Sequence, residues 1–137
     1  MRNVRIRGFT LIELMAGMVI VAILVSLALP SFRDTLRKSR RSDAMDSILN
    51  IHLSQERYRV NNATYGTLVQ LGKTDPLVSA DGHYSLTITV NTATNYTIVA
   101  AAQGDQATDS CGDFTLTFTA GVITKTADGD DAICWRK

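Results

Sequence analysis

The sequence predicts an α+β fold in which one long N-terminal α-helix packs on a four-stranded antiparallel sheet. Three observations predict this fold: an apolar run that is uncharged after Glu13, a helix-period stripe of apolar residues behind it, and later threonine-rich segments in which apolar and polar residues alternate. About 30 of the 137 residues belong to the N-terminal apolar region, which leaves roughly 105 for one modest head domain.

Residues 9–32 form the predicted transmembrane half of the helix. The run from Phe9 to Leu29 holds 21 residues, enough to cross a hydrocarbon core of about 30 Å as a helix. Pro30 removes one backbone hydrogen bond, so we expect a kink there. Glu13 is the one charged residue of the run. A carboxylate in a membrane helix costs about 2.5 to 3.5 kcal/mol on insertion scales, which predicts a partner or a function for it.

The residues around Glu13 do not predict catalysis. Residues 8–32 contain no histidine, no cysteine and no second acid that could orient a base or complete a metal shell. If the chain were cut after Gly8, the new amine on Phe9 would lie one helical turn from Glu13. It could pair with this carboxylate or with Glu13 of a neighbouring helix.

Here the residues resemble a known family. A basic leader, Gly8-Phe9-Thr10-Leu11-Ile12-Glu13 and an uncharged run are together similar to the class III leader and N-terminal helix of type IV pilins and of the related type II secretion pseudopilins. The resemblance implies that a prepilin peptidase/methyltransferase removes residues 1–8 and methylates Phe9. It also implies that Glu13 pairs with the N-terminal amine of an adjacent subunit during assembly. The implied partners are other pilin subunits, an inner-membrane assembly platform and the bacterial inner membrane, with no cofactor.

Two other interpretations of the N-terminus are an ordinary secretory signal and an uncleaved anchor. Arg2, Arg5 and Arg7 would suit a signal peptide, but its cleavage site would place Pro30 where a small residue belongs, and Glu13 would interrupt its apolar region.

A basic cluster follows the apolar run, and it bears on orientation. Its members are Arg33, Arg37, Lys38, Arg40 and Arg41. The lysine and arginine rule alone would keep this cluster in the cytoplasm, whereas the resemblance and the cysteines favour a periplasmic head that later joins an extracellular pilus. We interpret the cluster as a collar that faces solvent or lipid headgroups, in preference to a DNA groove.

Residues 33–60 predict the amphipathic half of the helix, ended by Asn61-Asn62. The apolar stripe consists of Ala44, Ile48, Ile51, Gln55 and Tyr58, widened by Met45, Leu49 and Leu53. We expect the polar residues to lie largely on the solvent side: Arg40, Arg41, Asp43, Asp46, Gln55, Glu56 and Arg57.

Residues 61–82 predict a connecting loop, and residues 83–126 the sheet. In the loop, Leu68, Val69 and Leu71 are the expected packing anchors, and Tyr65 with Leu68 should seal the core edge. The expected strands are residues 84–90, 96–103, 114–118 and 122–125, with Ala120-Gly121 as the last turn. The amphipathic half of the helix should cover their apolar face.

Cys111 and Cys134 are the two cysteines of the chain, separated by 22 residues. A disulfide is the economical interpretation, and closing such a loop should stabilise the fold by roughly 3 kcal/mol. Free thiols or a metal pair are the alternatives, which His52 and His83 do not support because they lie far away in the sequence. The segment 111–134 resembles the disulfide-bounded D-region of type IV pilins, most closely PilE-type minor pilins.

No catalytic motif is present, and we do not expect an enzyme. Asp128-Gly129-Asp130-Asp131 could be read as a calcium loop, but its spacing does not fit an EF-hand, and an exposed acidic turn is the preferred interpretation.

Two classes of function remain. One is a structural subunit of a type IV pilus, major or minor, with a role in pilus assembly, twitching motility or adhesion. The other is a tip module that binds DNA, a host surface or another minor pilin. A type II secretion pseudopilin is the nearest structural alternative. Loss of the three leader arginines changes the formal charge from +1 to −2. The segment Cys111 to Cys134 holds Lys125 against four aspartates, which makes nucleic acid an unexpected partner.

Overall fold

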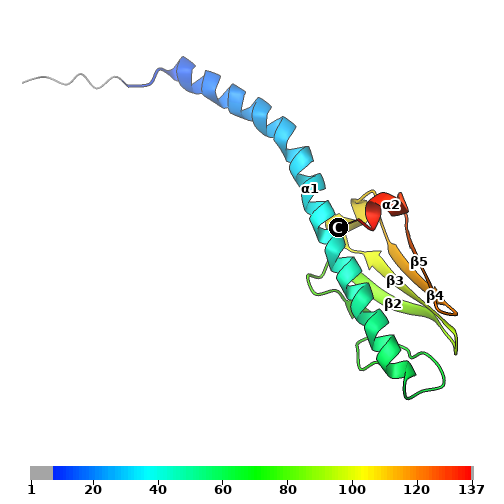
Figure 1. The fold of residues 1–137 in the computed structure, drawn as a ribbon. Coiled ribbons are helices and arrows are strands. Elements are labelled where there is room, and N and C mark those ends of the chain that lie inside the picture. The colour runs from blue at the N-terminus through cyan, green and yellow to red at the C-terminus, as the bar shows by residue number, and fades with distance from the viewer. Residues whose placement is uncertain (1–7, 137) are drawn as a thin grey trace, which may run out of the picture. The chain divides into compact units, whose positions relative to one another are not determined.

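The computed structural model of the chain describes residues 8–136, so all of the predicted leader except Gly8 lies outside the described residues. The chain divides into two units, one ending at Leu36 and one beginning at Arg37. In chain order the elements are α1 (Leu11–Arg59), β1 (Leu77–Val78), β2 (Tyr84–Asn91), β3 (Asn95–Ala102), the 3-10 helix η1 (Gly104–Thr108), β4 (Phe114–Thr119), β5 (Val122–Ala127) and α2 (Asp131–Cys134) (Figure 1).

The first unit holds the apolar half of α1. Thr10 caps the helix, because its hydroxyl accepts a hydrogen bond of 3.3 Å from the N–H of Glu13. The helix continues through residue 30 as one element, so the kink at Pro30 stays a prediction. This part of α1 is long and apolar enough to cross a membrane, and none of it is buried against the protein.

The second unit is built on an antiparallel sheet with the order β1-β2-β3-β4-β5. Ile98 of β3 pairs with Ile88 on one side and with Leu116 on the other. The predicted number of four strands was wrong, because Leu77–Val78 adds a short edge strand in which Leu77 lies opposite Leu86. Two residues among turn formers are too few to show the alternation that marks a strand in a sequence.

The turn between β4 and β5 is the predicted Ala120-Gly121 pair. Both residues have a positive φ, 48° at Ala120 and 93° at Gly121. Two-residue hairpin turns with positive φ at both positions match the twist of the flanking strands, and glycine adopts this conformation without strain.

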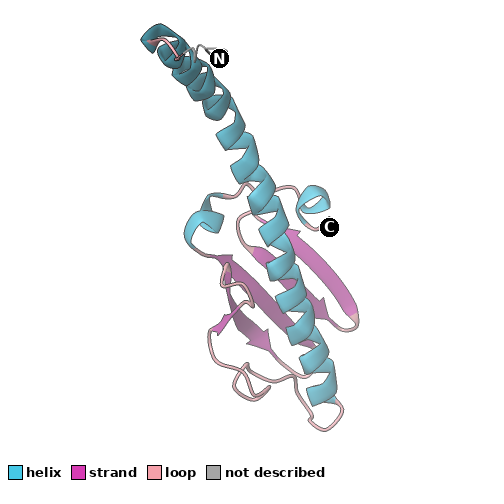
Figure 2. Ribbon diagram, turned by 90° about the vertical axis from the view of Figure 1, so that its left-hand side faces the viewer, coloured by secondary structure: helices cyan, strands magenta, loops and turns pink. Residues whose placement is uncertain are grey.

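The core lies between the sheet and the second half of α1, which crosses one sheet face (Figure 2). Ala44, Ile48 and Ile51 supply the helix side, and Tyr65 with Leu68 closes the edge as predicted. The sheet side consists of Tyr84, Leu86, Tyr96, Ile98, Ala100, Phe114 and Leu116. The structure therefore confirms the predicted α+β class with the long helix on the sheet.

The sequence-based prediction was wrong for three polar residues of α1, which it placed on the solvent side. Arg41, Asp43 and Gln55 are 6%, 7% and 0% exposed. Each is hydrogen-bonded to a distant segment of the chain that the helical period cannot reveal.

The apolar stripe of α1 is also narrower than predicted. Leu49 and Leu53 are about half exposed, and Val69, an expected anchor of the loop, is two-thirds exposed. The sheet covers one narrow face of the helix, so Leu49 and Leu53 remain outside the core, whereas Met45, the third residue expected to widen the stripe, is 8% exposed.

Candidate assembly site and the surfaces of the head

The predicted assembly residues lie at the N-terminal end of α1. Phe9 is 86% exposed, and the side chain of Glu13 forms no hydrogen bond or ion pair within residues 8–136. The helix cap uses the backbone N–H of Glu13, which leaves the carboxylate to interact outside the subunit. A carboxylate that is unpaired at the start of an apolar helix can receive a cation from a neighbouring chain.

An exposed apolar surface flanks Glu13 and continues along the first unit. Leu11, Ile12, Met18 and Leu27 are each at least 66% exposed, and the large apolar side chains between them are also exposed. Soluble monomers rarely expose apolar patches of such extent, so the patch is a surface for lipid or for neighbouring protein.

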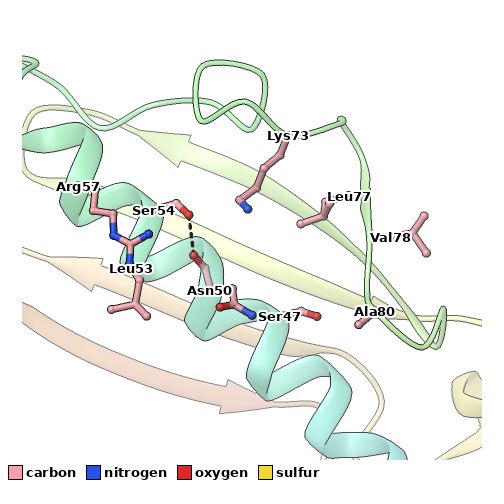
Figure 3. A pocket seen from close by; sticks show the side chains of 9 residues that line it. All are labelled: Ser47, Asn50, Leu53, Ser54, Arg57, Lys73, Leu77, Val78 and Ala80. Atoms are coloured by element: carbon pink, nitrogen blue, oxygen red, sulfur yellow. Dashed lines mark hydrogen bonds between the residues drawn. The ribbon is translucent and has the colours of Figure 1, made fainter.

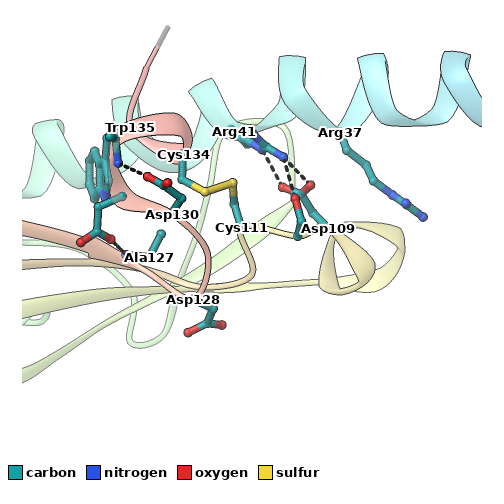
Figure 4. The surroundings of a disulfide bond; sticks show 12 residues. Arg37, Arg41, Asp109, Cys111, Ala127, Asp128, Asp130, Cys134 and Trp135 are labelled. Atoms are coloured by element: carbon teal, nitrogen blue, oxygen red, sulfur yellow. Dashed lines mark hydrogen bonds and ion pairs between the residues drawn. A yellow bond between two sulfur atoms is a disulfide. The ribbon is translucent and has the colours of Figure 1, made fainter.

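A disulfide joins Cys111 to Cys134 (Figure 4). Both cysteines are 1% exposed. The adjacent Trp135 donates a hydrogen bond of 3.1 Å from Nε1 to the carbonyl oxygen of Thr126. Its ring packs edge to face with that of Phe114, with the two ring centroids 5.3 Å apart. The bond and these contacts hold α2 against the end of the sheet.

A buried ion pair joins α1 to the segment that precedes Cys111 (Figure 4). Arg41 donates from Nε and from Nη2 to the two carboxylate oxygens of Asp109, both at 2.7 Å. The hydrogen bond with Asp109 raises the pKa of Arg41. Burial acts to raise the pKa of Asp109, but the hydrogen bond and the charge of Arg41 outweigh it and hold that pKa below its usual value. Both groups therefore stay charged at neutral pH.

Gln55 and Asp43 hold two loops against α1. Gln55 donates to the carbonyl oxygen of Gly66 at 2.7 Å and accepts from the N–H of the same residue at 2.8 Å. Asp43 accepts a hydrogen bond of 2.6 Å from the hydroxyl of Ser79. The sequence carried one signal for this role, because Gln55 falls within the apolar stripe of the helix.

The carboxylates of the acidic turn accept hydrogen bonds from backbone N–H groups. Asp128 accepts from the N–H of Asp113, and Asp131 accepts from the N–H of Ala127. Asp130 caps α2 by accepting from the N–H of Ala132. Within residues 8–136, no group of three or more histidine, cysteine or acidic side chains is arranged to hold a metal ion.

A polar pocket lies between α1 and the loop that leads into β1 (Figure 3). Arg57 of the helix and Lys73 of the loop supply its positive charge, and the cavity measures about 390 Å³. The other residues that line it are Ser47, Asn50, Leu53, Ser54, Leu77, Val78 and Ala80. Two cations with hydroxyl and amide neighbours can hold an anionic group.

Two family models match the chain. One is described as "Type IV minor pilin ComP, DNA uptake sequence receptor" and matches residues 30–115. The other is described as "Prokaryotic N-terminal methylation motif" and matches residues 3–29.

The curated relatives align with part of this chain and with part of their own length. The type II secretion system core protein G of Klebsiella michiganensis is 32% identical over 87 residues, which are 61% of this chain and 61% of that protein. The type IV major pilin protein PilE1 of Neisseria gonorrhoeae is 31% identical over 84 residues, 61% of this chain and 39% of PilE1. The type IV major pilin protein PilA of Myxococcus xanthus is 38% identical over 56 residues, 41% of this chain and 26% of PilA. Across the Klebsiella michiganensis protein and two further type II secretion system core G proteins, the aligned regions span 42–61% of the relative's length.

The exposed apolar helix, the helix-on-sheet head and the disulfide define a pilin-like subunit. Since the minor-pilin model covers more than half of the chain, the chain belongs to the type IV pilin family, among the ComP minor pilins that this model describes. Members of this family are structural proteins. The description of that family model names a DNA receptor, whereas the acidic segment 111–134 makes nucleic acid an unexpected partner.

Proposed function

We propose that this chain is a minor structural subunit of a type IV pilus. A prepilin peptidase cuts after Gly8 and methylates Phe9, and the subunit waits in the inner membrane with its head in the periplasm. The assembly platform then extracts it, and the apolar helices of neighbouring subunits pack together.

One observation carries this proposal: the carboxylate of Glu13 is unpaired within residues 8–136 and stands at the head of an exposed apolar helix. In a filament of packed helices, the amine of Phe9 of one subunit neutralises Glu13 of another. The pairing occurs inside an apolar bundle, where an unpaired carboxylate is costly. The pairing therefore favours one axial offset between neighbouring subunits.

The first experiment is mass spectrometry of the chain from cells that form pili. We expect a mature N-terminus at methylated Phe9. A chain that keeps Met1, or one that is cut near Ser31, would contradict the processing.

The second experiment compares Glu13→Val with Glu13→Asp. The valine variant should insert into the membrane and be absent from sheared filaments, because it cannot receive the amine. The aspartate variant keeps the charge and should recover part of the incorporation. Equal incorporation of the valine variant and the wild type would show that the carboxylate has another role.

Copy number separates a minor pilin from a secretion pseudopilin or a major pilin. We expect this chain in sheared pili at a small fraction of the main subunit. Its absence from pili, together with a secretion defect on deletion, would favour the pseudopilin.

A second candidate function is contact with DNA, favoured by the description of the family model that matches residues 30–115. The pocket of Arg57 and Lys73 suits a phosphodiester, since two cations line one cavity away from the acidic turn. Basic residues that neutralise two phosphates should contribute about −1.8 to the slope of log affinity against log salt concentration.

The test measures binding of duplex DNA to the mature full chain in detergent, over a series of salt concentrations. Arg57→Gln/Lys73→Gln should weaken binding and make the dependence of affinity on salt concentration less steep. Lys38→Gln/Arg136→Gln removes the same charge elsewhere and should leave both values near wild type. Unchanged binding by the first variant would remove this pocket from any DNA contact.

A further inference from the structure

A second basic pocket lies where α1 enters the head, on the side of α2. Lys38, Ser39, Ser42 and Met45 line it from α1, and Ile133 with Arg136 lines it from the C-terminal segment. The cavity measures about 550 Å³, which exceeds that of the pocket at Arg57 and Lys73.

The two sides of this pocket come from segments that are far apart in the sequence. Lys38, Ser42 and Met45 are spaced by four and three residues, so they lie on one face of α1. Arg136 follows Cys134 by two residues, and the disulfide holds that segment in place. Residues nearly 100 positions apart in the sequence therefore form one site.

Two charges of the pocket are available to a ligand. Arg41 also lines it, but Asp109 neutralises this residue. The side chains of Lys38 and Arg136 form no hydrogen bond or ion pair within residues 8–136. The nearby acids Asp130 and Asp131 accept hydrogen bonds from backbone N–H groups of their own segment.

The chemistry of the lining is mixed. Two cations and the hydroxyl of Ser39 suit a phosphate, whereas Met45 and the 58% exposed Ile133 offer apolar surface beside it. A phospholipid presents this combination, a phosphate next to glycerol and acyl chains, whereas a DNA backbone presents successive phosphates and sugars.

The position along the chain also favours a lipid. Lys38 follows Pro30 by eight residues, which is about 12 Å of helix. The headgroup layer on each side of a bilayer core is roughly 5 to 8 Å thick, and lysine side chains extend toward it. A phosphate ligand also gives a role to Lys38, one of the basic residues that follow the apolar run on the side where the lysine and arginine rule does not expect them.

We propose that this pocket binds the phosphate of a membrane phospholipid, between Lys38 and Arg136, and so seats the head on the bilayer while the subunit is stored. This inference rests on the proposed function, since it requires the apolar half of α1 to be in a membrane. Extraction into a filament would then release the lipid.

The test uses the mature full chain in mild detergent, titrated with phosphatidylglycerol or with a phosphate-free glycolipid that has the same acyl chains. Native mass spectrometry counts the lipids that stay bound. We expect one retained phosphatidylglycerol, little glycolipid, and an affinity at least about tenfold lower in Lys38→Gln/Arg136→Gln, because two charge-assisted hydrogen bonds are lost. Arg57→Gln/Lys73→Gln removes the same charge and should bind like the wild type, and Trp135 fluorescence checks the fold of each variant.

Three results would overturn the inference. Equal loss of lipid in both double variants would indicate general attraction by charge, and equal retention of the glycolipid would show that phosphate is not recognised. Loss of duplex DNA affinity in Lys38→Gln/Arg136→Gln, with unchanged lipid retention, would assign the pocket to nucleic acid. A wild-type chain that retains the lipid as expected, but is unmethylated and absent from pili, would refute the proposed function alone.

Discussion

The buried pair of Arg41 and Asp109 should control the stability of the head. Replacing Asp109 by leucine leaves Arg41, whose side chain is 7% exposed, without the two 2.7 Å hydrogen bonds that its guanidinium donates. Removing one partner of a buried ion pair typically costs about 3 to 5 kcal/mol, against at most about 1 kcal/mol for exposed pairs. We therefore expect Asp109→Leu to lower the free energy of unfolding by about 3 to 5 kcal/mol.

The measurement is urea unfolding of the full chain in mild detergent, followed by fluorescence. Trp135 is the one tryptophan of the sequence and packs on Phe114, so its emission reports the head. Asp105→Leu is the matched control, because Asp105 is an exposed residue of η1, the 3-10 helix that ends directly before Asp109, and it should change stability by no more than about 0.5 kcal/mol.

A double variant separates the charge from the packing. Arg41→Met/Asp109→Leu leaves no unpaired buried charge, so it should be more stable than Asp109→Leu alone. A cost below about 1 kcal/mol for Asp109→Leu, or additive costs in the double variant, would refute the argument from buried charge.

The same pair predicts a dependence on pH. The pKa of Asp109 is lower in the folded chain than its usual value of 3.8. The folded state therefore binds its proton less readily than the unfolded state, and the stabilisation is complete well above pH 3.8 and is lost as the pH falls through the lower folded value. The stability of the double variant should fall less steeply in this acidic range.

Three further predictions concern other parts of the head. Gln55→Ala should lower the free energy of unfolding by about 1 to 3 kcal/mol, because the N–H and carbonyl of Gly66 lose their buried partner; an unchanged urea midpoint would contradict this. Cys111→Ser/Cys134→Ser should lose about 3 kcal/mol in the same assay, and alkylation of the unreduced wild type should label neither cysteine. Burial raises the pKa of Tyr84 from 10.0 to about 12. The stability that depends on its protonated hydroxyl should therefore be complete below pH 10 and should decline as the pH rises toward 12. In a titration followed by tyrosinate absorbance, Tyr84→Phe should lose the step near pH 12.

Local patterns were sufficient for the main elements of the fold. The helical period placed Ala44, Ile48 and Ile51 in the core, and two-residue alternation placed Phe114 and Leu116. These patterns work because each element buries one face, and the spacing of side chains along that face is a property of the backbone.

Contacts between distant segments escaped the same patterns. Arg41 and Asp43 are charged and were expected in solvent, yet loops 68 and 36 residues later in the sequence bury them. The favourable partners arrive through tertiary structure, so a helical wheel counts these residues as exposed. Leu49 and Leu53 show the converse, since the sheet does not reach them.

The order of residues by itself determined a membrane-length apolar helix with one carboxylate near its start, and an amphipathic helix followed by alternating strands, because both follow from local hydrophobicity and backbone geometry. Only the tertiary structure decided which polar residues are buried and where charges gather. Arg57 and Lys73 line one pocket because the loop folds against α1, and Lys38 and Arg136 line another because the disulfide holds the C-terminal segment in place. Such pockets depend on distances between segments that no local pattern encodes.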